Sequence, residues 1–165
     1  MAKMMMFYMP DDPALLAAIG RVAIRHGQLH HILRMAVKSV AGVTVEEAID
    51  ATERQTFADI ARRARRLAKQ RLGEGPALVK LDALLERFRR ANRRRNDLLH
   101  SLWAQELDGD PQMRTQGPSW APIPKAVDLD ALAVEMEQLT LEMNQARLEG
   151  WLRDALSKSP AAPGK

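Results

Sequence analysis

The sequence predicts an all-α fold: an antiparallel bundle of four to five helices with a long loop before the last helix. Apolar residues recur at alternating steps of three and four over several long segments, and most connections between these segments are short. The 46% hydrophobic and 28% charged residues are typical of a globular chain. We therefore expect one helical domain over residues 13–157, with an N-terminal extension at 1–12 and a disordered tail at 158–165.

The first helix is expected at residues 13–41. Asp12 can cap its N-terminus, Pro13 suits its first turn, and Gly42 can end it. Its apolar stripe follows the helical spacing through Leu15, Ile19, Val22, Leu29, Leu33, Ala36 and Val40. His26 falls on this stripe, and a histidine in such a place is more often a hydrogen-bonded structural residue than a ligand.

Three further helices are expected between residues 44 and 105. Thr44 with Glu47 forms a capping box that opens a short helix. Thr56 can cap a basic helix over 57–72. A long helix is expected over 76–105, because its proline start and its apolar spacing both favour one.

The last third contains the long loop and the last helix. Residues 106–127 have no helical periodicity and are rich in glycine and proline, which predicts either a functional loop or a small hairpin. Asp128 is expected to cap a helix over 128–157, whose stripe is Leu129, Leu132, Met136, Leu139, Met143 and Ala146.

Positive charge is concentrated along the chain well beyond the net charge of +4. Two basic runs stand out: Arg54, Arg62, Arg63, Arg65, Arg66, Lys69 and Arg71, followed by Arg87, Arg89, Arg90, Arg93, Arg94 and Arg95. Such a concentration is typical of a protein that binds a polyanion. The alternative is a solvated helix face whose arginines pair with the acidic last helix.

Composition excludes several classes of function. The chain has no cysteine, which rules out disulfides, thiol catalysis and cysteine-ligated metal sites. No apolar run is long enough to span a bilayer, and the N-terminus lacks the features of a secretory signal. We therefore expect a cytoplasmic protein without a membrane partner.

The helix over 76–105 contains an anomaly. Its apolar stripe, Leu81, Leu85, Phe88, Asn92, Arg95, Leu99 and Leu102, is interrupted by an arginine, which is costly to bury without a partner. Beside it lies a polar row of Asn92, Asn96 and His100, each four residues from the next. Arg95 and His100 lie about 140° apart around the helix, so they cannot share one face. Both can face a cleft or a second copy.

The segment from Arg95 to His100, RNDLLH, resembles the signature of the HEPN superfamily (higher eukaryotes and prokaryotes nucleotide-binding), an arginine usually followed by a polar residue and, a few positions later, a histidine. The resemblance implies a helical bundle with the motif on a late helix. It also implies a homodimer whose motifs face each other, which we expect to form through the helices at 76–105 and 128–157. Many members are metal-independent endoribonucleases, often toxins or defence effectors, and others only bind.

The same arginine-to-histidine spacing occurs between Arg21 and His26 and between Arg25 and His30. The polar Asn96 and the interrupted apolar stripe favour the later helix.

The residue types suit RNA cleavage without a metal or other cofactor. Arg95 would stabilise the charge of the transition state, His100 would move protons, and Asn96 would orient His100 or hold a phosphate oxygen. Candidate RNA-backbone contacts are Arg62, Arg66, Arg93 and Arg94, and candidate auxiliary residues are His26, His30 and Asn92. The expected partners are RNA, a second copy of the chain and an antitoxin protein.

The sequence leaves two other functions open, and it gives little support to a metal site. The main one is a non-catalytic dimeric helical module that binds nucleic acid, nucleotide or a partner protein. Another is an antitoxin-like or scaffolding bundle in which Arg95 makes only a structural salt bridge. His26 and His30 have a spacing that can hold a metal, but no third ligand is evident and no metal site is expected.

Overall fold

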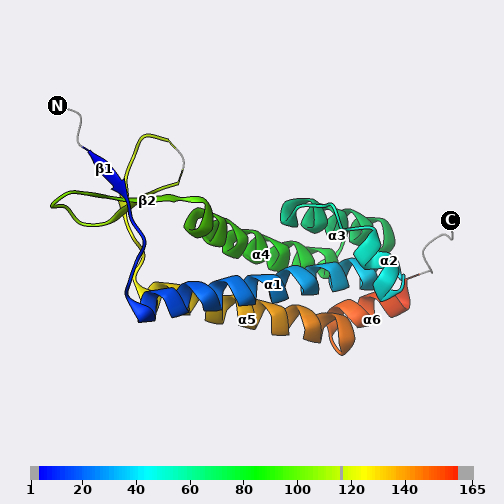
Figure 1. The fold of residues 1–165 in the computed structure, drawn as a ribbon. Helices are drawn as coiled ribbons and strands as arrows, with labels where there is room; N and C mark the ends of the chain where they lie inside the picture. The colour runs from blue at the N-terminus through cyan, green and yellow to red at the C-terminus, as the bar shows by residue number, and fades with distance from the viewer. Residues whose placement is uncertain (1–3, 116, 160–165) are drawn as a thin grey trace.

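The computed structural model describes residues 4–115 and 117–159, and long helices make up most of it (Figure 1). The elements in chain order are β1 (Met5–Phe7), α1 (Pro13–Ala41), α2 (Val45–Asp50), α3 (Phe57–Leu72), α4 (Pro76–His100), β2 (Leu102–Glu106), β3 (Gln112–Arg114), β4 (Ala121–Pro122), α5 (Ala126–Leu148) and α6 (Trp151–Lys158). The predicted helical class is confirmed, and a small antiparallel sheet adds to it.

The start and end of α1 follow the predicted caps. The Asp12 carboxylate accepts a hydrogen bond of 2.9 Å from the Ala14 amide, and Pro13 is the first helical residue. Gly42 ends the helix in the left-handed conformation, with φ of 70°, which glycine adopts without the clash that a Cβ would cause. Local chemistry therefore sets both ends of this 29-residue helix.

Two capping boxes define the short helix and the basic helix that follow. The side chains of Thr44 and Glu47 each bond the other's backbone amide at the start of α2. Thr56 and Asp59 do the same at the start of α3, as the Thr56 cap predicts.

The long helices α1, α4 and α5 lie side by side, and α3 lies against α1 and the first part of α4 (Figure 1). The expected antiparallel packing holds for α3 with α4 and for α4 with α5, but α1 and α5 run in the same direction. The cause is the sheet, which lies where α4 ends and α5 begins, so that α5 returns along α1.

One hydrophobic core joins the helices. Its largest fully buried side chains are Val22, Leu29, Leu33, Ile60, Leu81, Leu85, Phe88, Leu132, Met136, Leu139, Met143 and Leu152. Each such side chain stabilises the fold by about 1.5–3 kcal/mol relative to an exposed one. The apolar stripes therefore pack inward as the helical spacing predicts.

The helix expected over 76–105 ends five residues early, at His100. Ser101 takes an extended conformation, and the Trp103 indole donates a hydrogen bond of 3.3 Å to the carbonyl of Leu98, one of the groups freed where the helix stops. The apolar stripe through Leu102 is continued by a strand, because strand partners elsewhere in the chain compete for these residues.

The four strands form an antiparallel sheet in the order β1-β2-β3-β4. Met6 pairs with Gln105, Trp103 with Met113, and Gln112 with Pro122. The segment 106–127, predicted as a functional loop or a small hairpin, supplies the antiparallel strands β3 and β4, as the hairpin alternative predicts. The N-terminal extension supplies an edge strand.

The last helix also differs from its prediction. It begins at Ala126 after Lys125, and Asp128, the expected cap, lies in its first turn, where a carboxylate suits the helix dipole. It breaks at Gly150, where a Cβ would come within 3.2 Å of the Ala146 Cα, so the chain can bend closely there and α6 begins.

The expected disordered tail begins within the helical region, since α6 runs to Lys158. The rest of that tail, residues 160–165, lies outside the described residues, as do residues 1–3 of the extension. Among the described residues, none of the helices combines the length and the apolar character that crossing a membrane requires.

Candidate functional site

The polar residues singled out on two helices meet between α1 and α4. These helices run in opposite directions, and His26 of α1 lies opposite Asn92 of α4. The His26 Nε2 and the Asn92 Oδ1 are 2.8 Å apart in a hydrogen bond, in which the imidazole N–H donates to the amide oxygen. His26 is therefore a half-buried, hydrogen-bonded histidine, as its place on the apolar stripe predicts. The same bond links it to α4, the helix that contains Arg95 and His100.

Aromatic rings surround this bond at the point where α3 begins. Phe57, the first residue of α3, stacks on His26 with ring centroids 5.6 Å apart and lies 5.7 Å from His30. Phe57 also contacts the buried Phe88 of α4 at 6.4 Å. The two imidazoles therefore lie against an apolar wall, which limits how water can solvate them.

Arg95 is half-buried on α4, one turn beyond Asn92. Its Nη1 donates a hydrogen bond of 3.0 Å to the Asn96 side-chain oxygen. Asn96 therefore holds Arg95 rather than His100. Among the described residues no carboxylate pairs with Arg95, and its buried Nε has no hydrogen-bond partner. The described part of the chain thus gives no support to a structural salt bridge at this position.

The environment lowers the pKa of two histidines of α1, His26 and His30. Burial lowers the pKa of His26 most, and Arg95 lowers it further, while the hydrogen bond with Asn92 acts in the opposite direction. Burial is also the largest cause for His30, followed by the positive charge of Arg34 and then by His26 and Arg95. Both shifts favour the neutral imidazole, the form that can accept a proton.

His100, the last residue of α4, lies apart from this cluster. It is exposed, and within the described residues no hydrogen bond or ion pair orients its ring. Five residues separate it from Arg95, which on a helix is about 7.5 Å of rise and about 140° of rotation. The structure thus brings together His26, Asn92 and Arg95, but not His100.

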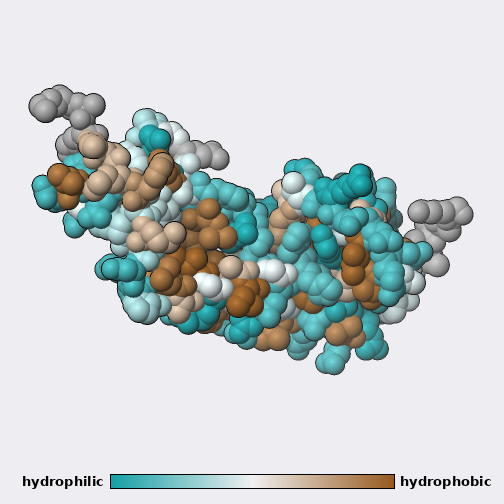
Figure 2. All heavy atoms as spheres, viewed as in Figure 1, coloured by the Kyte–Doolittle hydropathy of each residue, from teal (hydrophilic) through white to brown (hydrophobic). Residues whose placement is uncertain are grey.

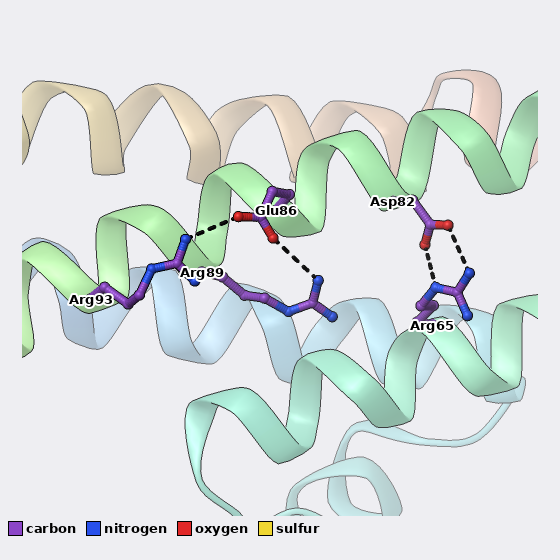
Figure 3. Close-up of polar contacts among 5 residues, drawn as sticks. All are labelled: Arg65, Asp82, Glu86, Arg89 and Arg93. Carbon is purple, nitrogen blue, oxygen red and sulfur yellow. Dashed lines mark hydrogen bonds and ion pairs between the residues drawn. The ribbon is translucent and has the colours of Figure 1, made fainter.

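Three of the four candidate RNA-backbone arginines have carboxylate partners. Arg62 pairs with Asp59, Arg93 with Glu86 at 3.0 Å, and Arg94 with Glu135 at 2.8 Å. Figure 3 shows Arg93 and Arg89 on the two sides of Glu86, with both arginines and the carboxylate on α4.

The basic helices are also tied to their neighbours by ion pairs. Arg65 of α3 forms two hydrogen bonds, of 2.8 and 3.0 Å, with Asp82 of α4 (Figure 3). Arg87 and Arg94 pair with Glu142 and Glu135 of α5, as the pairing alternative for the basic region predicts. The fourth candidate, Arg66, is exposed, and the described residues offer it no hydrogen bond or ion pair.

Two residues of the cluster, Arg34 and Phe57, were not predicted from the sequence. Arg34 lies one helical turn after His30, so its eight-residue spacing from His26 was the available signal. Phe57 follows the Thr56 cap, and nothing local to the sequence indicates that it faces the histidines of α1. Residues 4–115 and 117–159 contain no group of three or more histidine or acidic side chains placed to hold a metal ion.

Comparisons with known proteins do not assign the chain to a family. The chain matches no family model, no curated protein and no solved structure.

Proposed function

We propose that the chain is a metal-independent endoribonuclease of the HEPN type that cuts RNA at a site shared by two copies. The observation that carries this proposal is Arg95, a half-buried arginine beside His26 and His30, with no carboxylate partner in the described part of the chain. A guanidinium in this state is free to bind a phosphate with its planar set of donors.

The position of His100 supports a second copy. In one chain His100 and Arg95 point to different sides of α4, so a site that uses both needs another protomer to supply one of them. A two-fold axis would place the motif of one copy opposite that of the other.

The part of α1 and α4 that α3 leaves uncovered is the surface we assign to this contact. We call it the open α1–α4 face, defined by Leu16 and Ala23 of α1 and by Asn96 and Leu99 of α4. Leu16, Ala23 and His30 share one side of α1 through their seven-residue spacing. Figure 2 shows a hydrophobic area over the ends of α1 and α4 near the sheet.

The opposite side of α4 is already occupied. Arg87–Glu142 and Arg94–Glu135 join α4 to α5 within one chain, so the seam between the two helices is intramolecular. We therefore replace the interface expected through the helices at 76–105 and 128–157 with one formed by α1 and the side of α4 that faces away from α5.

The chemistry follows from RNA's own nucleophile. A neutral histidine takes the proton from a ribose 2′-hydroxyl as its oxygen attacks the adjacent phosphorus, forming a cyclic phosphate. The 5′-oxygen leaves with a proton from a second, protonated histidine. His100 of one copy would be the base and the partner's His100 the acid, while Arg95 stabilises the added negative charge. In this account His26, His30 and Asn92 position Arg95.

Cleavage of single-stranded RNA in the presence of EDTA tests the proposal. We expect RNA products with cyclic phosphate ends, no cleavage of DNA, and at least a hundredfold loss in His100→Ala and in Arg95→Ala, by the usual size of these catalytic effects. The matched control is Arg90→Ala, an exposed arginine of the same helix. If His26→Ala abolishes cleavage and His100→Ala does not, the base lies on α1.

The alternative function is a dimeric helical module that binds RNA, a nucleotide or a partner protein without cutting. The observation that favours it is the exposed His100 ring, which the described residues leave without an orienting hydrogen bond. Tight, salt-sensitive RNA binding by a wild-type chain that never cuts RNA would select this alternative. An antitoxin protein as a further partner belongs to the first proposal.

A further inference from the structure

A cationic cluster extends along α1 beyond the residues that cleavage needs. His26, His30 and Arg34 are each four residues from the next, so they form one row on the helix. Arg95 of α4 reaches this row and acts electrostatically on both histidines. The cluster thus draws on two helices, and Arg34 lies at its far end from the motif.

The charges of this cluster are unbalanced. Arg34 and Arg95 are both positive, and in the described residues neither forms an ion pair with a carboxylate. The contrast within the same helices is clear, because Arg25 pairs with Glu137 at 2.6 Å and Arg94 with Glu135 at 2.8 Å. Two half-buried guanidinium groups near one imidazole are costly unless an anion offsets them.

The cluster also contains unused hydrogen-bonding groups. The His30 Nε2, the Arg34 Nε and the Arg95 Nε are all shielded from solvent, and the described residues give none of them a partner. Buried polar groups in proteins almost always have a partner. Seven such atoms without a partner occur in the described residues, and three of them belong to this cluster, where a bound anion would satisfy them. All three can carry a proton and donate to an oxyanion.

We propose that His30, Arg34 and Arg95 form a binding site for a phosphate group, with His26 and Phe57 as its wall. A phosphate accepts from several donors at once and offsets two positive charges, which matches what the cluster offers. The inference deepens the proposed function, and its interpretation as a subsite for an RNA phosphate next to the cleaved one rests on that proposal. Phosphate binding itself does not depend on cleavage.

Binding of inorganic phosphate to the full chain tests the site. Isothermal titration and the proton NMR signal of the His30 ring should both report saturable binding at constant ionic strength. Arg34→Gln should weaken it about tenfold or more, the usual loss of one charge-assisted hydrogen bond. Arg90→Gln, an exposed arginine of α4, is the matched control for the loss of one positive charge and should bind as the wild type does.

Two further arms separate the sources of the phosphate. The probe is a short oligodeoxynucleotide, which lacks the 2′-hydroxyl and cannot be cut. Comparing it with and without a 5′-phosphate shows whether the site prefers a terminal or an internal phosphate. Binding of either form more tightly than inorganic phosphate supports the subsite. Acetate that binds as well as phosphate would overturn the inference in favour of a carboxylate ligand. No saturable phosphate binding, or equal loss in both arginine variants, would also overturn it.

The result is separable from the proposed function. Phosphate binding that Arg34→Gln removes, in a protein that never cuts RNA, would support this site and contradict the nuclease proposal. RNA cleavage by a protein that does not bind phosphate would do the reverse.

Discussion

His26 of α1 and Asn92 of α4 share a hydrogen bond of 2.8 Å, which joins two antiparallel helices at the point where α3 stops covering them. Arg95 lies one turn beyond Asn92 on the same helix. The bond therefore holds α4 in register against α1 next to the arginine on which the proposed chemistry depends.

Removing either partner of this bond should destabilise the fold. We expect His26→Ala and Asn92→Ala each to lower the free energy of unfolding by about 1–3 kcal/mol, because the remaining group stays half-buried without its partner. The double variant should cost less than the sum of the two single variants by about 1 kcal/mol. Urea unfolding measures this, with His31→Ala, an exposed histidine of α1, as the control. Additive losses would show that the bond contributes nothing.

The free energy of unfolding should begin to fall at a higher pH than the protonation of carboxylates alone would cause. Burial and nearby arginines lower the pKa of His26 and His30 in the folded chain, while the unfolded chain binds these protons at about pH 6.5. Below that pH the unfolded state binds more protons, so the free energy of unfolding falls as the pH drops toward the folded pKa values and then levels.

Urea unfolding between pH 7.5 and pH 5 checks this, at roughly the range in which histidines titrate. A His26→Gln, His30→Gln double variant should flatten the slope. A slope that persists unchanged in that variant would assign the acid sensitivity to other groups.

The open α1–α4 face should control the oligomeric state. Leu99→Glu places a charge on this face and should convert the dimer to a monomer, because an unpaired charge is costly to bury in an interface. Leu141→Glu is the matched control: Leu141 belongs to a second exposed apolar row, at seven-residue spacing on the outer side of α5, formed by Val127, Val134, Leu141 and Leu148.

Light scattering at micromolar concentration reports the mass, and circular dichroism confirms that both variants fold. A monomeric wild type would contradict the proposed dimer. Dissociation by Leu141→Glu alone would move the interface to α5.

RNA binding should depend more on Arg66 than on Arg94. Arg66 is exposed, and no described residue neutralises it, whereas Glu135 already offsets the charge of Arg94. Arg66→Gln should therefore lower the slope of log K against log salt by about 0.7, the release of one counterion from single-stranded RNA. Arg94→Gln removes the same charge and is the control, which should lower this slope less. Equal slopes in the two variants would show that the ion pair of Arg94 does not keep it from contacting RNA.

The sequence predicts the helices best where their ends depend on local chemistry. The Asp12 cap, the Gly42 stop and the Thr56 capping box all lie within a few residues of the groups they bond, and both α1 and α3 keep their predicted bounds. The end of α4 could not be predicted this way. Leu102 continues the apolar spacing of the helix, but its strand pairing with Arg114 depends on residues remote in sequence.

The candidate site shows the same division. Arg95 could be found because it breaks an apolar stripe, which is a local irregularity. The packing of Phe57 against His26 and the approach of Arg95 to His30 depend on how three helices meet, so no spacing in the sequence predicts them. The separation of Arg95 from His100 follows from helix geometry alone.

The central claim, that the His100 residues of two copies complete one site, is tested most directly by mixing wild-type chains with an equal amount of His100→Ala chains. The two are unfolded together, refolded together and assayed for RNA cleavage in EDTA. Only a quarter of the randomly assorted dimers contain two wild-type chains, so the mixture should show about a quarter of the activity of the same total concentration of wild type. A mixture that keeps half of that activity, although mass spectrometry detects mixed dimers, would contradict the shared site.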